Sequence, residues 1–114
     1  MKSVKLIVEY ETKTGPVTMD IKTGQGQLGV HYAKIGNRII YKGEDANVIN
    51  VGKTNALKNK KIRIVTVVSV LNQSSRKTSV TYCLKGGKKI SKWLVDEDVD
   101  TDKAVLYVAE ISFK

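Results

Sequence analysis

The chain contains 114 residues, 41% of them hydrophobic and 27% charged, a balance that predicts one globular domain over residues 1–114 and excludes a disordered chain. Its formal net charge of +9 indicates an anionic partner, or a surface that keeps copies apart, without identifying either. No stretch approaches the roughly 20 apolar residues of a membrane-spanning helix, so we expect no membrane insertion. A single cysteine, Cys83, excludes an internal disulfide.

The N-terminal segment is expected to be a strand. Residues 4–11 alternate with a period of two, which is typical of a half-buried strand. A signal peptide would need its apolar centre where Glu9 stands, so we expect no leader and a location in the cytoplasm or within a particle. A turn at 14–16 then leads to a second alternating segment at 17–23.

The rest of the chain predicts six further strands. They are expected at residues 32–35, 38–41, 62–71, 77–84, 88–95 and 104–113. The Gly-Asn link at 36–37 favours a tight hairpin because both residues tolerate a positive φ, and the two glycines at 86–87 join another antiparallel pair. Residues 50–61 show no apolar face at helical spacing, so we expect a loop there with one helical turn, capped by Thr54 or Asn55.

Two of these strands carry further expectations. Residues 62–71 form the longest β-branched run and predict a central strand that is apolar on both faces. Its most buried side chains are expected to include Val65, Val67, Val68 and Leu71. In the last strand, apolar residues lie on one parity as far as Val108 and on the other from Ile111, and a β-bulge near Ala109 would restore one continuous buried face.

These elements predict an all-β fold. It is expected to be a single-domain antiparallel β-sandwich, or a small β-barrel, of about seven or eight strands with little helix. The last four strands are expected to be consecutive antiparallel neighbours. Short turns between strands are typical of both architectures, so the spacing does not choose between them.

Short motifs that resemble catalytic or nucleotide-binding sites lack the context that such sites need. Residues 24–29 (GQGQLG) match a dinucleotide-binding pattern, but that loop must open a helix, and a glycine-rich loop between strands is favoured here. Residues 52–54 resemble the end of a P-loop, which needs glycine where Asn47 stands. One histidine, His31, and the single Cys83 offer neither a spaced nucleophile–base pair nor three metal ligands. We therefore expect no enzyme activity and no cofactor.

An acidic segment at 96–102 holds five carboxylates in seven positions. Four of them recur at every second residue: Asp96, Asp98, Asp100 and Asp102. Clustered carboxylates suit Ca²⁺, but an EF-hand would need glycine and glutamate where Thr101 and Tyr107 stand. We favour a solvated acidic turn between two strands, with a weak cation site or a contact for a basic partner as alternatives.

Residues 46–95 carry eleven Lys or Arg residues and no Asp or Glu, so nearly all of the charge imbalance lies there. On adjacent antiparallel strands these side chains would merge into one basic patch. The residues expected to form this binding patch are Lys53, Lys58, Lys60, Lys61, Arg63, Arg76, Lys77, Lys85, Lys88, Lys89 and Lys92, together with Trp93. Such a patch suits phosphate groups. Recognition of base edges is poorly supported because nine of the eleven cations are lysines rather than arginines. Base stacking is poorly supported because Tyr82 shares the parity of buried residues.

The chain therefore predicts a non-enzymatic protein-binding or structural assembly module, whose partner is another protein or copies of itself. Its basic patch would meet acidic protein, such as the 96–102 segment of another copy. The alternative function is binding of the nucleic-acid phosphate backbone through residues 46–95. In its β-rich, Lys/Asn-rich composition the chain resembles small sandwich modules of phage particles and bacterial injection machines, and this resemblance, which no motif carries, implies an oligomeric component of a larger particle or virion.

Overall fold

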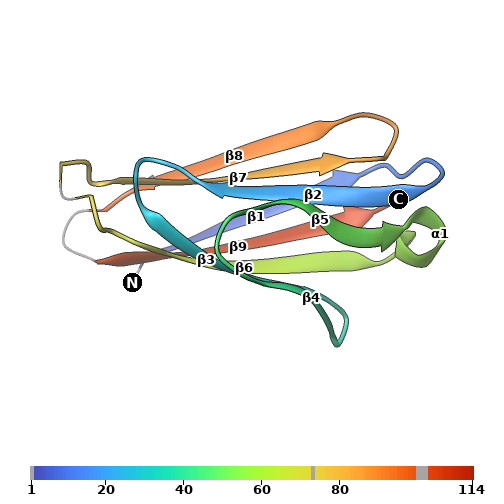
Figure 1. The fold of residues 1–114 in the computed structure, drawn as a ribbon, viewed down its shortest axis with the longest axis horizontal. Coiled ribbons are helices and arrows are strands. Elements are labelled where there is room, and N and C mark those ends of the chain that lie inside the picture. The colour runs from blue at the N-terminus through green and yellow to red at the C-terminus, as the bar shows by residue number, and fades with distance from the viewer. Residues whose placement is uncertain (1, 73, 100–102) are drawn as a thin grey trace.

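Two β-sheets pack face to face in the computed structural model, which describes residues 2–72, 74–99 and 103–114. The molecule is elongated, with extents of 44 × 25 × 21 Å, and its strands run along its length (Figure 1). Each sheet ends in open edge strands and the two sheets do not close on each other. The all-β sandwich prediction is therefore confirmed, and the barrel alternative is wrong.

Within the described residues the chain forms nine strands and one short helix. They are β1 (Lys2–Tyr10), β2 (Pro16–Thr23), β3 (Leu28–Ile35), β4 (Arg38–Gly43), β5 (Ala46–Lys53), α1 (Thr54–Leu57), β6 (Lys61–Ser69), β7 (Lys77–Lys85), β8 (Ser91–Asp98) and β9 (Ala104–Phe113). Sheet A has the order β1-β9-β6-β3-β4, and sheet B has the order β5-β2-β7-β8. The strand missing from the prediction is β5, because Val48 has a left-handed φ of 56° and the pairing with β2 shifts register, which breaks the period of two.

The pairing of the strands differs from the prediction in two respects. Most neighbours are antiparallel as expected, but β1 pairs with β9 in parallel along its whole length. The last four strands are not consecutive neighbours, because the chain crosses from sheet A to sheet B after β6 and returns after β8. Alternation reports which face of a strand is buried, and it carries no information about which sheet the strand joins.

Strand β6 is central in sheet A but contributes only one face to the core. Its inward side chains are Ile62, Ile64, Thr66 and Val68, all fully buried. Of the four side chains expected to be most buried, Val68 is confirmed, whereas Val65 is half-buried, Val67 is 37% exposed and Leu71 is 63% exposed. The expectation is wrong for Val65 and Val67 because the second apolar face of β6 points away from sheet B, and it is wrong for Leu71 because β6 ends at Ser69 and Leu71 lies in the exposed segment that follows.

Strand β9 is regular throughout. Every second residue from Val105 to Phe113 is buried, and the pairing with both β6 and β1 is unbroken. The predicted bulge near Ala109 is therefore wrong. Ala109 itself continues the inward face, and the apolar residues Ala104, Leu106 and Val108 lie on the outward face of β9.

The predicted helical turn is present as α1. Its N-cap position is Lys53, which makes no side-chain capping hydrogen bond. The prediction that Thr54 or Asn55 caps this turn is therefore wrong. The Thr54 hydroxyl instead donates to the carbonyl oxygen of Gly15 at 3.0 Å. This contact ties α1 to the β1–β2 connection.

The glycine-rich segment at 24–29 connects two strands, as predicted, but its last two residues, Leu28 and Gly29, already belong to β3. A Cβ atom on Gly24 would collide with the hydroxyl of Ser79, and one on Gly29 would collide with the hydroxyl of Thr23. Close packing therefore accounts for these glycines. A strand follows at the point where a phosphate-binding loop would need a helix.

Candidate interaction surfaces

Connections between strands gather at one end of the sandwich. The β1–β2 connection, α1 with its flanks, the β7–β8 connection and the C-terminal residues all lie on the right in Figure 1. Backbone hydrogen bonds join them: the Lys88 N–H donates to the Glu11 carbonyl at 3.1 Å, and the Asn59 N–H donates to the Phe113 carbonyl at 2.9 Å. The fold therefore brings segments that are distant in sequence onto one surface.

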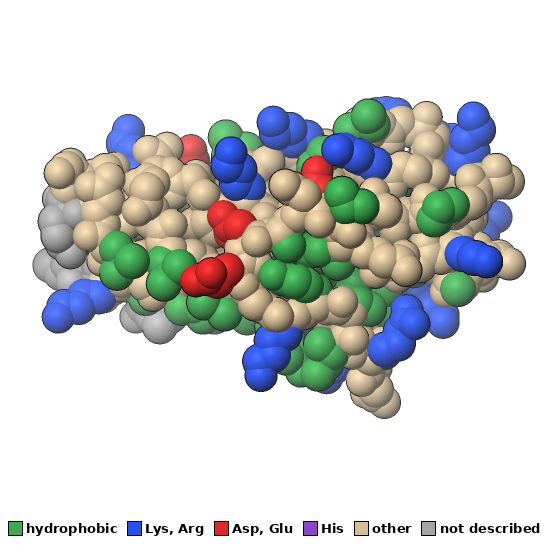
Figure 2. Space-filling view, viewed as in Figure 1, with side chains coloured by type: hydrophobic (Ala, Val, Ile, Leu, Met, Phe, Trp, Pro, Cys, Tyr) green, Lys and Arg blue, Asp and Glu red, His purple; other side chains and the backbone are tan. Residues whose placement is uncertain are grey.

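This surface, which we call the lysine-rich end, consists of residues 11–15, 53–61, 85–89 and 113–114. Its lysines are Lys13, Lys53, Lys58, Lys60, Lys61, Lys85, Lys88, Lys89 and Lys114, and its one carboxylate side chain is that of Glu11. Four of these lysines form ion pairs: Lys61, Lys85, Lys88 and Lys114. The other five have no ion-pair partner among the described residues, so a surplus of positive charge remains at this end (Figure 2).

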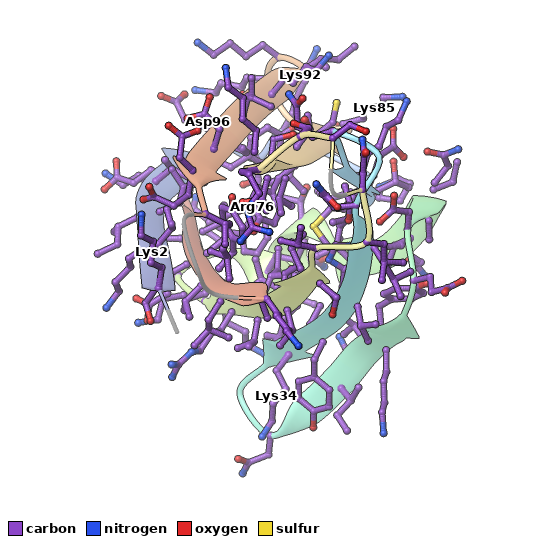
Figure 3. All side chains as sticks on the ribbon, turned by 90° about the vertical axis from the view of Figure 1, so that its left-hand side faces the viewer. Lys2, Lys34, Arg76, Lys85, Lys92 and Asp96 are labelled. Atoms are coloured by element: carbon purple, nitrogen blue, oxygen red, sulfur yellow. The ribbon has the colours of Figure 1, made fainter. Side chains whose placement is uncertain are left out.

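The remaining basic residues of the predicted patch lie elsewhere. Arg76 and Lys77 precede and begin β7 at the opposite end, where Arg76 Nε donates to the Val99 carbonyl at 2.9 Å. Arg63 points outward from sheet A, and Lys92 points outward from sheet B (Figure 3). The expectation of one merged patch is therefore wrong: seven of the eleven cations meet at the lysine-rich end and four do not.

Trp93 does not accompany the lysines as an exposed platform. It lies on the inward face of β8, partly buried against the core, with its ring 6.4 Å from that of Tyr10 in an edge-to-face contact. Tyr82 is buried as predicted, and desolvation raises its pKa to about 12. A contact of the lysine-rich end with nucleic acid would thus involve charge without base stacking from either ring.

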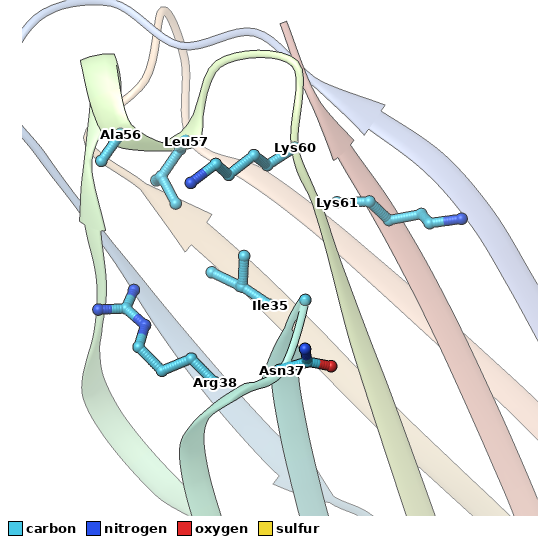
Figure 4. Close-up of a pocket in the computed structure, with 8 residues that line it drawn as sticks. Ile35, Asn37, Arg38, Ala56, Leu57, Lys60 and Lys61 are labelled. Carbon is cyan, nitrogen blue, oxygen red and sulfur yellow. The ribbon is translucent and has the colours of Figure 1, made fainter.

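A cleft of ≈ 980 Å³ adjoins the lysine-rich end, between the β3–β4 turn and α1 (Figure 4). Ile35 and Leu57 give it an apolar floor, and Arg38 and Lys60 extend toward it from opposite walls. Lys61 points away, toward Glu110, with which it forms an ion pair at 3.5 Å. The cleft can therefore hold an anionic group beside apolar surface. Arg38 was missed by sequence reasoning because it lies outside residues 46–95.

The acidic segment begins inside β8 rather than in a turn. Asp96 and Asp98 point outward and are exposed, and Asp98 lies opposite Lys77 in the pairing with β7 (Figure 3). Asp100 and Asp102 lie outside the described residues. Among the residues that are described, no group of three His, Cys, Asp or Glu side chains is placed to hold a metal ion.

His31 is fully buried between the sheets and belongs to a polar network that reaches the surface. Its Nδ1 lies 2.7 Å from the hydroxyl of Thr66, and its Nε2 lies 2.8 Å from a carboxylate oxygen of Asp45. The hydroxyl and the backbone N–H of Thr23 donate to the two oxygens of Asp45, at 2.8 and 2.9 Å. Burial alone would raise the pKa of Asp45, but the hydrogen bonds from His31 and Thr23 outweigh it and hold that pKa below its ordinary value.

The outer face of sheet A carries an apolar patch on three adjacent strands. Its eight residues are Leu28, Val30 and Tyr32 of β3, Val65 and Val67 of β6, and Ala104, Leu106 and Val108 of β9. They occupy adjacent positions in the registers of the three strands, and Ser69 is the one polar residue among the nine positions of this grid. Val30 is 48% exposed and Val67 37% exposed, so the patch faces solvent in the isolated chain.

The same outer face becomes charged toward the lysine-rich end. One row of paired residues crosses all five strands of sheet A, from β1 to β4, and we call it the charged row. It consists of Ile7, Glu110, Arg63, Lys34 and Ile39. Each strand thus supplies one side chain to the row, and the charges stand in the middle with an isoleucine at each edge.

The sequence shows the apolar residues of this patch but does not show that they lie on the outer face of a sheet. The two-sided apolar character of 62–71 was visible, but both faces were assigned to the core. The alternating apolar residues of β9 carried the same signal and were explained by a bulge. Strands β3, β6 and β9 share this two-sided pattern, and only their adjacency in the sheet makes a patch of it.

Comparison of the chain with protein-family models, with curated proteins and with solved structures gave no match. Across the described residues, no helix has the length and apolar character needed to cross a bilayer.

Proposed function

We propose that the chain is a non-enzymatic assembly module, acting in the cytoplasm or within a particle, and that the apolar patch of sheet A binds protein. The patch is the observation that carries this proposal. Three rows on three strands cover about 300 Å² at ordinary strand spacings. Exposed apolar surface of this extent on a single chain is often a protein-binding site.

The other sheet supports this assignment by contrast. The outward positions of β2 and β7 in sheet B carry Asp20, Lys22, Thr81 and Cys83 beside one another, which is the polar character expected of a face that stays in water. A sheet needs an apolar outer face only if something covers it. The difference between the two faces therefore favours a partner on sheet A.

The test is the native mass of the complex recovered from cells, with and without nuclease. We expect a nuclease-resistant complex that is lost with Val30→Lys, because a charge in the patch must be desolvated when the partner binds. Leu94→Lys is the matched control, since Leu94 is an exposed apolar residue on the outward face of sheet B. A complex that tolerates Val30→Lys, or one that nuclease disperses, would contradict the proposal.

A second function, binding of the phosphate backbone of nucleic acid, is favoured by the lysine-rich end. Five lysines without an ion-pair partner among the described residues, together with the cleft that Arg38 and Lys60 flank, can neutralise several phosphates. Lysine acts as a point charge and suits contacts that do not depend on base sequence. Nuclease-sensitive mass in the experiment above would support this function over protein assembly.

A further inference from the structure

We propose that the partner on the outer face of sheet A is a second copy of this chain, related by a two-fold axis that runs along β6. This inference rests on the proposed function and names the occupant of the same patch. A two-fold interface uses one surface twice, so that surface must be complementary to itself. The apolar patch and the charged row of the outer face of sheet A meet this requirement, whereas Lys5 and Lys42, at the two edges of the Tyr32 row, would face each other at the rim.

A rotation about β6 exchanges β9 with β3 and β1 with β4, and it keeps each row of the sheet opposite itself. In the apolar patch, Leu106 would face Val30 of the second copy, and Val108 would face Tyr32. Val65 and Val67 would meet their own copies on the axis. An axis across the strands at the middle of the whole face would instead lay the apolar patch on the charged end of the face, which desolvates charge against apolar surface.

The charged row is also complementary to itself under this rotation. Glu110 would face Lys34 of the second copy, and the isoleucines at the two edges, Ile7 and Ile39, would face each other. Arg63 and its copy would meet at the axis, each beside a Glu110 of its own chain. Opposite charges placed in this way fix the alignment of the two copies more than they add affinity.

The size of the face matches the requirement of a stable dimer. Five strands of six to ten residues cover roughly 700 Å² at ordinary strand spacings, and a standard interface buries about 800 Å² on each partner. The apolar patch alone is smaller than this, so the charged row and the edges must be included. Face-to-face sheets commonly cross at about 30°, which an axis within about 15° of β6 provides.

The first measurement is the mass of the purified protein in solution as its concentration is raised. We expect a dimer, and we expect Val67→Lys to be monomeric because two lysines would then meet at the axis. The control Leu94→Lys should remain dimeric, and thermal unfolding should show that both variants are folded. A wild-type protein that stays monomeric at every concentration would overturn the proposed dimer. If Val30→Lys nevertheless disperses the complex recovered from cells, the proposed function stands with a different protein as the partner.

The second measurement uses charge exchange between two chains. Glu110→Lys alone and Lys34→Glu alone should each weaken the dimer about tenfold, because the two-fold presents each pair twice and reverses it from attraction to repulsion. Mixed together, the two variants should form a heterodimer. The lysine introduced at position 110 of one chain then faces the glutamate introduced at position 34 of the other, and the second pair keeps its native Lys34 and Glu110.

A Lys88→Glu control at the lysine-rich end should leave the dimer unchanged. Variants that fail to associate when mixed, although each is folded, would overturn the proposed axis.

Discussion

Asp45 reaches from the connection between β4 and β5 to a histidine in the interior of the sandwich. Its side chain remains partly exposed, while His31 is fully buried. One carboxylate therefore holds β2, through Thr23, and β3, through His31, against the β4–β5 connection. A His–Asp pair is often read as catalytic, but here the ring is enclosed and its other nitrogen lies against Thr66.

Asp45→Asn should lower the free energy of unfolding by about 1–2 kcal/mol, because one amide oxygen cannot accept all the hydrogen bonds that the two carboxylate oxygens receive. The folded-state pKa of Asp45 lies below its ordinary value of 3.8, so its contribution is complete above that value and is lost as the pH falls through the folded-state pKa. Unfolding titrations from neutral to acidic pH should show the difference between wild type and variant shrinking. The neighbouring Glu44→Gln is the control. A difference that persists at the lowest pH would contradict this account.

At this scale the sequence predicts loop residues better than it predicts their partners. Gly24 and Gly26 lie in a loop, as predicted from the absence of helix and strand signals around them, whereas Gly29 lies in β3. Gln27 in the same loop was not singled out, yet its side chain accepts from the Leu71 and Asn72 N–H groups, both at 2.9 Å, and its amide donates to the Ser75 carbonyl at 3.0 Å. These partners lie more than forty residues from Gln27 in the sequence. No local sequence pattern predicts them.

Among the elements, a period of two locates strands but does not reveal what covers each face. β9 was predicted with its observed bounds, and the hairpin of β3 and β4 followed from its Gly-Asn link. β5 was missed because Val48 interrupts its alternation. In β6 and β9 the apolar residues on both parities were all assigned to the core, although one set lines the outer face of sheet A. A second apolar face indicates burial without saying whether the same chain or another one provides it.

The burial of the inward face of β6 can be tested by two matched truncations, one within β6 and one in the exposed segment two residues beyond its end. Ile64→Ala should lower the free energy of unfolding by about 2–5 kcal/mol because Ile64 is fully buried between the sheets. Leu71→Ala removes a side chain of similar size that is 63% exposed, and its effect should stay within about 0.5 kcal/mol. Chemical denaturation of the two variants measures both values. Equal losses would mean that the assigned inward face of β6 is incorrect.

On the scale of the whole molecule, the fold redistributes the charge that the sequence concentrates. Residues 46–95 hold eleven cations, but the strands carry them along a body 44 Å long. Seven collect at the lysine-rich end, where Lys13 joins them from the β1–β2 connection and Lys114 joins them from the C-terminus. A sequence reading predicts the sum of the charges correctly. Their grouping depends on which connections meet at the end of the sandwich.

The lysine-rich end provides a test of the second function that separates position from net charge. One variant replaces by glutamine the five end lysines that lack an ion-pair partner among the described residues: Lys13, Lys53, Lys58, Lys60 and Lys89. A matched variant removes the same number of charges from other surfaces, at Lys5, Lys22, Lys42, Lys77 and Lys92.

If the end binds phosphate, the first variant should bind duplex DNA of any sequence more weakly. The slope of log affinity against log salt should also flatten by about 0.9 for each phosphate that is no longer neutralised, because fewer counterions are released on binding. The matched variant should keep most of the wild-type slope. Equal flattening in both variants would show that only the net charge matters. Unchanged DNA binding in both variants would mean that the lysines of the lysine-rich end only keep copies of the chain apart at that end. That role is compatible with pairing of two copies through sheet A.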